Sequence, residues 1–556
     1  MNQTSVDRAR VVELLDRSRA NPWHRMRAPI VLVAGALLAF SPTLFSSFHF
    51  DDYSLFSDPI VTSSTGWWEV FRLERTRPLT YFTFWLNFQA GSNDPVGYHA
   101  GNLFIHLAAV WLAWSIFREV TDPKVALVAA AVFALHPLQS EPVAYIFARA
   151  TLLSALFCLL AWKDWLDERP WRAAAFFGAA LLAKEEAIAF PAFLCGFEWI
   201  CRRHGWSWLR DRVKPLSAMF GLAALAAARL FYAESVTKGA GIGFELGEIT
   251  PARYLLTQGR VIWEYLGLLV WPAGLNFDRD FPLLQLGDFS AWLAWILLAG
   301  SIAASIGASW WLAGKRGTHP PVYWLLGFFI LLAPTSSIVP LADLIAERRM
   351  YLPMLSLSLA IGFLMKRTPN PALLAAGLVL CGLSFQRSLV WQTEESLWRD
   401  TVEKSPSKVR PKLQLARALE ATRGTDAEGL ALLQQAKALA PTDADVATEL
   451  GVFHLKAGDA ESALAEFQIA LNSTPSDAQA LTNYGAALYS LGDTGRASGA
   501  FDRALRSDPC HFDARNNSIL LANAVGQTER AVELSRAPTG CRYTREQAAA
   551  LAAGLR

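Results

Sequence analysis

The sequence has few charged residues and few cysteines for its length. Only 18% of its 556 residues are charged and the net charge is +2, whereas an average soluble protein is roughly 25% charged. This balance provides no general basic field, so we expect no nucleic acid partner. The six cysteines form no C-x-x-C pair, which excludes a zinc ribbon and a disulfide-dense scaffold.

Hydrophobic residues are abundant instead, at 53% of the chain, and they are distributed unevenly. Apolar segments of near-spanning length recur up to about Val390, whereas Ala, Leu, Asp, Glu and Arg dominate after Trp391. This pattern excludes a single soluble globule and a disordered chain. It predicts an all-α protein with a polytopic membrane domain over residues 28–390 and a soluble domain over 391–556.

The first apolar segment, residues 28–45, follows basic residues that include Arg25 and Arg27. No small-residue cleavage pattern follows it, so we interpret it as a signal anchor. Basic residues flanking a span stay on the cytoplasmic side. Residues 1–27 are therefore predicted to be a cytoplasmic N-terminus, and residues 46–97 a loop on the far side.

A spanning helix needs about 20 mostly apolar residues, and further candidates bring the total to about eleven spans. They lie near residues 101–117, 124–136, 150–162, 172–184, 187–201, 215–232, 290–312, 321–339, 351–365 and 371–390.

The segment 253–272 is also apolar, but it contains Arg260 and Glu264, which are costly at bilayer depth. We interpret it as a helix in the far interface, because counting it as a span would place later basic loops outside. The C-terminal domain then lies on the same side as residues 46–97. The alanine-rich spans and short loops favour a bacterial inner membrane, with this domain in the periplasm.

The C-terminal domain contains a sequence repeat of 34 residues. Pro441, Pro475 and Pro509 follow this spacing, as do pairs of small residues such as Gly451 and Gly485. A 34-residue period with small, aromatic and terminal proline positions is typical of tetratricopeptide repeats, which consist of two antiparallel helices each. Such arrays bind peptides or proteins in a concave groove, although the array could instead only stabilise the membrane domain.

Two cysteines in this domain are candidates for a disulfide. Cys510 begins one predicted helical hairpin and Cys541 follows its end. Antiparallel helices bring these ends together, so a Cys510–Cys541 disulfide is geometrically reasonable. It would agree with an oxidising far side.

The far-side loop opens with two adjacent carboxylates, Asp51 and Asp52, among aromatic residues. Burial against a bilayer would raise the pKa of a carboxylate and make it a better base. A helix cap or a solvated turn is the alternative. Adjacent residues of an extended segment point in opposite directions, so one role for both is not expected.

Other polar clusters recur at the same predicted membrane face, which suggests one cavity lined by acids, histidines and arginines. Its candidate residues are Arg77, His99, His106, His136, Glu141, Arg149, Lys184, Glu185, Glu347, Arg348, Arg349 and Tyr351. A base there can deprotonate an acceptor hydroxyl while a cation neutralises a lipid-linked phosphate leaving group. The repeats would present the acceptor.

Six motifs in order, followed by the repeats, resemble the transmembrane and tetratricopeptide-repeat O-mannosyltransferases, which have the GT-C glycosyltransferase fold. The motifs are F-x-F-D-D, R-P-L-T, G-Y-H-x-x-N-x-x-x-H, H-P-x-x-x-E-x-V-A, A-K-E and A-E-R-x-x-Y-L-P. The resemblance implies inverting, metal-independent transfer of a sugar, mannose in the animal members, from a polyprenyl-phosphate carrier to Ser or Thr.

Carried over by position, the resemblance makes Asp51 or Asp52 the catalytic base. Arg348 and Arg149 would bind the donor phosphate, with Arg349 and Lys184 as further candidates. The remaining candidates would order the site: Arg77, His99, His106, His136, Glu141, Glu185, Glu347 and Tyr351.

Three alternatives remain at this point. The enzyme could act on lipid A or a surface glycan, and then the repeats would have no acceptor to present. The chain could be a non-catalytic membrane scaffold for envelope or pilus assembly. A divalent-metal site at His49, Asp51, Asp52 and Asp58 matches in residue type, but we expect no metal or other cofactor, because arginines can neutralise a monophosphate.

Overall fold

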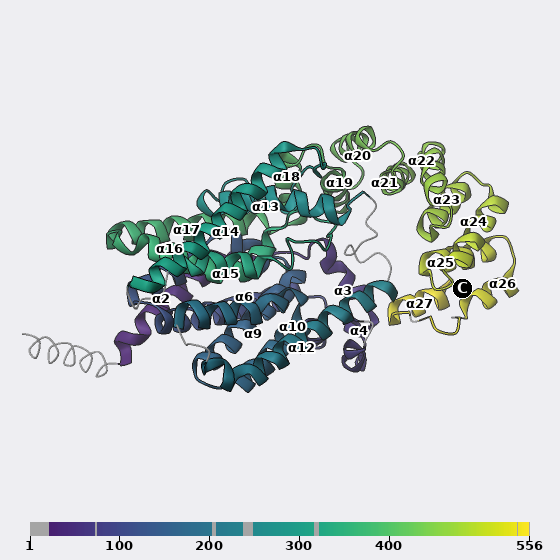
Figure 1. Ribbon diagram of the computed structural model, residues 1–556. Coiled ribbons are helices and arrows are strands. Elements are labelled where there is room, and N and C mark those ends of the chain that lie inside the picture. Colours follow the sequence, from purple (N-terminus) through teal and green to yellow (C-terminus); the bar gives the residue numbers. More distant parts are fainter. Residues whose placement is uncertain are drawn as a thin grey trace, which may run out of the picture. The chain divides into compact units, whose positions relative to one another are not determined.

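A computed structural model describes residues 22–72, 75–202, 207–236, 248–315, 322–536, 538–541 and 543–554. Every regular element among these residues is a helix (Figure 1), which confirms the predicted all-α class. The chain divides into two compact units, Met1–Thr393 and Glu394–Arg556. Most of the predicted cytoplasmic N-terminus lies outside the described residues.

The described residues of unit 1 contain six helical segments that are long and apolar enough to cross a membrane, which makes the chain a multi-pass membrane protein. They are Arg27–Phe45 (α2 with η1), Pro95–Val120 (α6), Ile146–Leu166 (η5 with α9), Arg210–Ala233 (within α12, Ser207–Val236), Phe289–Ala308 (within α14, Phe289–Lys315) and Asn370–Val390 (α17). The pair α7 (Pro123–Leu135) and Pro137–Ala144 (η4 with α8), bent by 49°, would be a seventh. The predicted count of about eleven spans therefore stays a prediction.

The remaining elements of unit 1 are shorter helices and α13. They are η2 (Phe50–Tyr53), α3 (Ser54–Ser57), α4 (Pro59–Thr62), η3 (Gly66–Phe71), α5 (Pro78–Gly91), α10 (Pro170–Ala183), η6 (Glu185–Ala189), α11 (Phe190–Gly196), η7 (Phe197–Arg202), α13 (Pro251–Val270), α15 (Tyr323–Leu332), η8 (Glu347–Met350), α16 (Tyr351–Leu364) and η9 (Met365–Arg367).

Two predicted continuous spans are interrupted in the structure. The segment predicted at 187–201 consists of three short helices, η6, α11 and η7. The segment predicted at 321–339 is helical only as far as Leu332, and Pro334 follows. Proline disfavours a helical conformation in the residue before it, so the prediction of one continuous helix is wrong beyond this point.

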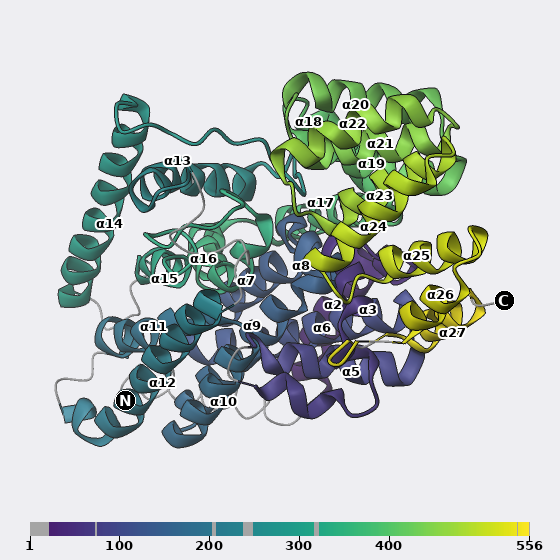
Figure 2. The ribbon, with the colours of Figure 1, turned by 90° about the vertical axis from the view of Figure 1, so that its right-hand side faces the viewer.

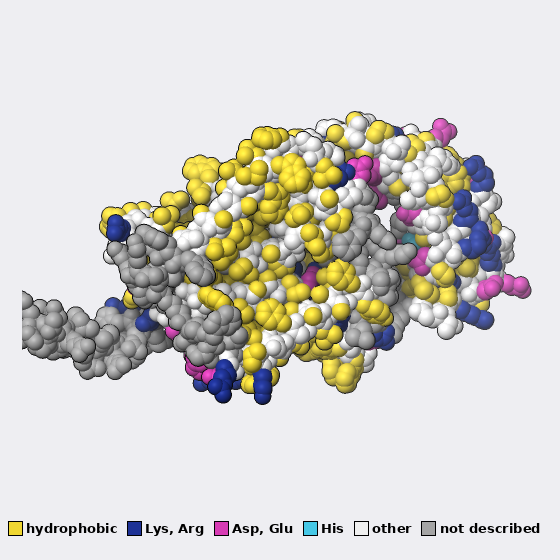
Figure 3. Space-filling model, in the orientation of Figure 1, with side chains coloured by type: hydrophobic (Ala, Val, Ile, Leu, Met, Phe, Trp, Pro, Cys, Tyr) yellow, Lys and Arg dark blue, Asp and Glu magenta, His cyan; other side chains and the backbone are white. Residues whose placement is uncertain are grey.

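The helices of unit 1 bury one large apolar core. Helix α9 packs against both α6 and α10, and these helices lie together in Figure 2. Outward-facing side chains are also apolar: only 17% of the α17 span is buried, and hydrophobic side chains cover much of the face of unit 1 in Figure 3. Apolar side chains on both the inside and the outside are expected of helices solvated by lipid.

Unit 2 consists of α18 (Glu394–Lys404), helical hairpins and a final helix. The hairpins are α19 (Val409–Arg423) with α20 (Ala427–Leu439), α21 (Ala444–Lys456) with α22 (Ala460–Ser473), α23 (Ala478–Ser490) with α24 (Thr494–Ser507), and α25 (Phe512–Ala524) with α26 (Thr528–Ser535); α27 (Arg545–Ala553) follows.

The repeated residues determine the turns and contacts of the hairpins. Gly458, Gly492 and Gly526 all have positive φ angles in the turn that joins the two helices of a hairpin, a conformation that glycine adopts without steric cost. Helix α27 begins with a capping box formed by Thr544 and Gln547. The structure joins Cys510 and Cys541 in a disulfide.

Close helix packing in a hairpin requires a glycine at position 485. A Cβ atom added at Gly485 would lie 2.6 Å from Cε1 of Phe501, whereas nothing lies within 4 Å of a Cβ added at Gly499. We therefore expect Gly485→Ala to destabilise unit 2 by about 1–3 kcal/mol through overpacking. Gly499→Ala should stabilise it by up to about 1 kcal/mol, because alanine is the better helix former.

Amide hydrogen exchange of α23 and α24 in the full chain measures both changes. Equal protection in the two variants would contradict the role assigned to the Gly485–Phe501 contact.

Candidate functional site

The buried carboxylate of Asp52 connects two short helices that are distant in sequence. Asp52 lies in η2, and its Oδ2 accepts a hydrogen bond from the backbone N–H of His49 at 2.9 Å. Its Oδ1 accepts one from the N–H of Phe147, just before α9, at 2.8 Å. Burial raises the pKa of Asp52 well above its usual value, and the two N–H donors lower it in part. Both oxygens therefore bind the backbone.

Asp51 has the opposite environment, because its side chain is exposed. Burial raises the pKa of the buried Tyr145 hydroxyl, the charges of Asp52 and Asp51 raise it further, and the Arg348 guanidinium lowers it in part. Tyr145 directly follows the H-P-x-x-x-E-x-V-A motif, but it is not among the residues predicted from the sequence.

Aromatic rings surround this position. The ring of Phe277 lies 5.3 Å from that of Tyr145 and 5.2 Å from that of Trp391, centroid to centroid. The Nε2 atom of His49 donates to the backbone oxygen of Trp391 at 2.6 Å. The start of the segment 46–97 and the end of unit 1 are therefore held together at the aspartate pair.

Arg348 forms the second charged part of this cluster. Its guanidinium contacts Oε1 of Glu141 at 2.5 Å and Oδ2 of Asp343 at 3.2 Å. Its backbone N–H donates to Oε2 of Glu141 at 2.9 Å. Burial would lower the pKa of Arg348, but the two carboxylates outweigh burial and raise it. Asp343 has no counterpart among the quoted motifs.

Glu347 and Arg349, on either side of Arg348 in the sequence, bind backbone groups of other residues. The Oε1 atom of Glu347 accepts from the N–H of Asn276 at 2.6 Å. Arg349 donates to the backbone oxygens of Leu344 at 3.2 Å and Asp343 at 2.5 Å. Glu347 and Arg349 therefore anchor loop segments.

Arg149 is buried among neutral acceptors. Its Nε donates to Oδ1 of Asn102 at 2.8 Å, and its two terminal nitrogens donate to Oδ1 of Asn87 at 2.5 Å and to the backbone oxygen of Tyr98 at 2.8 Å. Its guanidinium carbon lies 4.6 Å from the centre of the Phe84 ring. Arg149 thus connects α5, α6 and α9, while its predicted phosphate-binding role stays a prediction.

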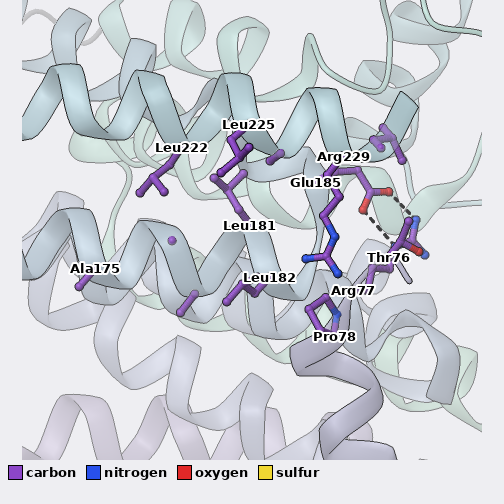
Figure 4. Close-up of a pocket in the computed structure, with 14 residues that line it drawn as sticks. Thr76, Arg77, Pro78, Ala175, Leu181, Leu182, Glu185, Leu222, Leu225 and Arg229 are labelled. Atoms are coloured by element: carbon purple, nitrogen blue, oxygen red, sulfur yellow. Dashed lines mark hydrogen bonds and ion pairs between the residues drawn. The ribbon is translucent and has the colours of Figure 1, made fainter. Parts of the chain in front are cut away.

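A separate charged cluster joins α5 to η6. Arg77 donates to both carboxylate oxygens of Glu185, at 2.5 and 3.1 Å, as the dashed lines of Figure 4 show. Burial would raise the pKa of Glu185, but Arg77 outweighs it and lowers this pKa to about 2. Lys184 contacts Glu186 at 2.7 Å and donates to Oγ1 of Thr151 at 2.6 Å.

The predicted histidines are buried and connect packed segments. His99 Nε2 donates to the backbone oxygen of Ser47 at 3.3 Å, and His136 Nε2 to that of Leu269 at 2.9 Å. His106 Nδ1 lies 2.8 Å from the hydroxyl of Tyr351. These three histidines and Tyr351 therefore form contacts between segments.

Comparisons with known proteins agree with the motifs. The tetratricopeptide repeat family matches residues 448–509. "Protein O-mannosyl-transferase F38B6.6" of Caenorhabditis elegans is 25% identical over 429 residues, which cover 71% of this chain and 60% of that protein. "Protein O-mannosyl-transferase Tmtc1" of Drosophila melanogaster is 38% identical over 22% of this chain and 15% of that protein. The predicted resemblance is confirmed.

The chain thus spans 60% or less of the length of these two relatives. Among solved structures, "MamA 41-end from Desulfovibrio magneticus RS-1" is 18% identical, with a TM-score of 0.23, over 25% of this chain and 78% of that one.

The burial of Glu347 makes stability depend on pH. Burial raises the pKa of Glu347 from 4.5 to about 7. Because the folded state favours the protonated form, its contribution to stability is complete below about pH 4.5 and is lost as the pH rises through about 7. Glu347→Gln keeps the acceptor for Asn276 and removes the charge. It should raise the Tm by a few degrees at pH 8 and leave it unchanged at pH 4.5.

Thermal unfolding of the full chain in detergent at the two pH values checks this expectation. The exposed Glu461, replaced as Glu461→Gln, controls for the loss of one negative charge. An equal Tm change for Glu347→Gln at both pH values would be inconsistent with a protonated Glu347 in the folded state.

Proposed function

We propose that this protein transfers mannose from a polyprenyl-phosphate carrier to Ser or Thr hydroxyls of proteins. The printed names of the matched relatives support the reaction class. The observation that carries the proposal for the site is the difference between the two aspartates: Asp52 is buried on two backbone N–H groups, whereas Asp51 is exposed beside it.

In this proposal Asp51 is the catalytic base and Asp52 is a positioning residue. The Asp51 carboxylate accepts the proton of the acceptor hydroxyl, and the resulting oxygen attacks C1 of the sugar. The bond from C1 to the phosphate oxygen breaks, and the polyprenyl phosphate leaves with the electron pair. One displacement of this kind inverts the configuration at C1, as in GT-C enzymes.

The phosphate that leaves carries negative charge, so a cation must lie near it. Arg348, Arg149, Arg349 and Lys184 are the candidates from the sequence. A cationic side chain can supply this charge without a metal ion. We therefore propose a metal-independent reaction.

The acceptor and the side of the membrane are further parts of the proposal. Arrays of tetratricopeptide repeats bind segments of other proteins, so unit 2 would present the acceptor to the aspartate pair. We place both on the periplasmic side of a bacterial inner membrane, opposite the N-terminus. The disulfide of unit 2 supports a compartment outside the reducing cytoplasm.

Conservative substitutions of the two aspartates test the assignment. Asp51→Asn removes the base and should lower the transfer rate by about 10²–10⁴-fold with an unchanged Tm. Asp52→Asn places an NH₂ group opposite one of two backbone N–H donors and should cost about 1–3 kcal/mol of stability. The measurement uses the full chain in membranes with radiolabelled polyprenyl-phosphate mannose, and protein is separated from lipid before counting.

Transfer of label to lipid in place of protein would contradict a protein acceptor. Unchanged transfer by Asp51→Asn would exclude it as the base. Activity that EDTA abolishes and a divalent metal restores would overturn the metal-independent mechanism.

A further inference from the structure

Two helices of unit 1 border an apolar groove that has no role in the reaction as proposed above. It lies between α10 and α12 and has a volume of about 390 Å³, within the range of about 300–1,000 Å³ typical of ligand pockets. In Figure 4, Leu181 and Leu182 of α10 face Leu222 and Leu225 of α12. The Leu225 side chain is 66% exposed, so an apolar chain could enter this groove from the bilayer.

One end of the groove is polar and carries excess positive charge. Arg77, Glu185 and Arg229 line it there, together with Thr76 (Figure 4). These two arginines and one glutamate together have a net charge of +1. Arg229 also donates to the backbone oxygens of Arg72 and Arg75, at 2.8 and 2.6 Å, which holds its guanidinium at this end. An anionic headgroup fits this charge.

Arg348 and Arg149, the first two predicted phosphate-binding residues, are less suited to a phosphate. Arg348 faces two carboxylates, those of Glu141 and Asp343, so a phosphate there would meet net negative charge. The Arg149 guanidinium is buried and donates to Asn102, Asn87 and Tyr98. A phosphate could reach it only after these contacts were broken.

The polar end of the groove lies at the start of a helix that packs against the segment of the proposed base. Tyr81, in the first turn of α5, packs against the cluster that contains Phe48 and Leu55, on either side of Asp51 in the sequence. A phosphate at Arg77 would therefore lie at the start of the helix that packs against the segment containing Asp51.

We infer that the groove between α10 and α12 binds the isoprenoid chain of the lipid donor, with its phosphate at Arg77 and Arg229. This assignment rests on the proposed function for the identity of the donor. The apolar walls suit a long hydrocarbon chain, and the arginine pair suits the single phosphate at its end. Gly178 lines the groove, and because it has no side chain it leaves space for the isoprenoid chain.

Two glycines offer a matched pair of variants. A Cβ atom at Gly178 would lie 3.7 Å from Cδ1 of Leu222, an ordinary contact inside the groove, whereas nothing lies within 4 Å of a Cβ at Gly221 on α12. Gly178→Leu should fill the groove without displacing the backbone. Gly221→Leu adds the same side chain to the outer surface, and both changes replace a helical glycine.

The test is photo-crosslinking of the full chain in nanodiscs with a benzophenone-tagged undecaprenyl phosphate, mapped by mass spectrometry. We expect labelled peptides from α10 and α12, at least fivefold weaker labelling in Gly178→Leu and in Arg229→Gln, and wild-type labelling in Gly221→Leu. Untagged undecaprenyl phosphate should abolish labelling, and phosphatidylglycerol at the same concentration should not. Wild-type labelling of Gly178→Leu, or equal competition by phosphatidylglycerol, would overturn the inference.

Failure of the inference and failure of the proposed function give different results. If mannose is transferred to protein but labelling maps elsewhere, the function stands and the groove is not the donor site. If labelling maps to the groove as expected but no variant or acceptor supports transfer, the lipid site stands and the proposed reaction fails. Thermal unfolding of each variant detects a loss of fold.

Discussion

The paired hydrogen bonds to the buried Asp52 carboxylate are the interaction on which the candidate site depends. A carboxylate out of contact with water is costly unless its oxygens accept hydrogen bonds. Asp52 meets this condition only when the N–H groups of His49 and Phe147 converge on it. The requirement joins η2 to the segment before α9. It also directs the adjacent Asp51 to the exposed side.

Arg348 and Arg77 satisfy a related constraint, because each of these partly buried cations is paired with a carboxylate. Arg348 pairs with Glu141 and Arg77 pairs with Glu185, so each cation joins two segments that are far apart in sequence. Removing one partner of such a pair leaves an uncompensated charge, which is strongly destabilising. The pairs therefore position loops between the apolar helices of unit 1. The groove at Arg77 and Arg229 is distinguished by a cation in excess of the carboxylates that line it.

Much of this organisation could be predicted from residue patterns. The 34-residue spacing of Pro441 and Pro475 identified hairpins whose turns and glycine contacts the structure contains. Long apolar segments identified the membrane helices α6 and α17. The break after Leu332 was missed, because a composition window averages over one proline. Tyr145 was also missed, since a lone tyrosine after a motif has no distinctive local pattern.

Residue patterns alone specify the all-α class, the apolar and repeat-containing parts of the chain, and the charged residues from which a site is built. Periodicity and composition are local properties, and they persist in any arrangement of the helices. Which of these charges meet depends on how the helices pack. Asp51 and Asp52 are the same residue type, but Asp52 alone accepts hydrogen bonds from the nearby His49 N–H and from the Phe147 N–H, 95 residues away. The same holds for Arg77 and Arg229, which line one groove because α5, α10 and α12 pack together.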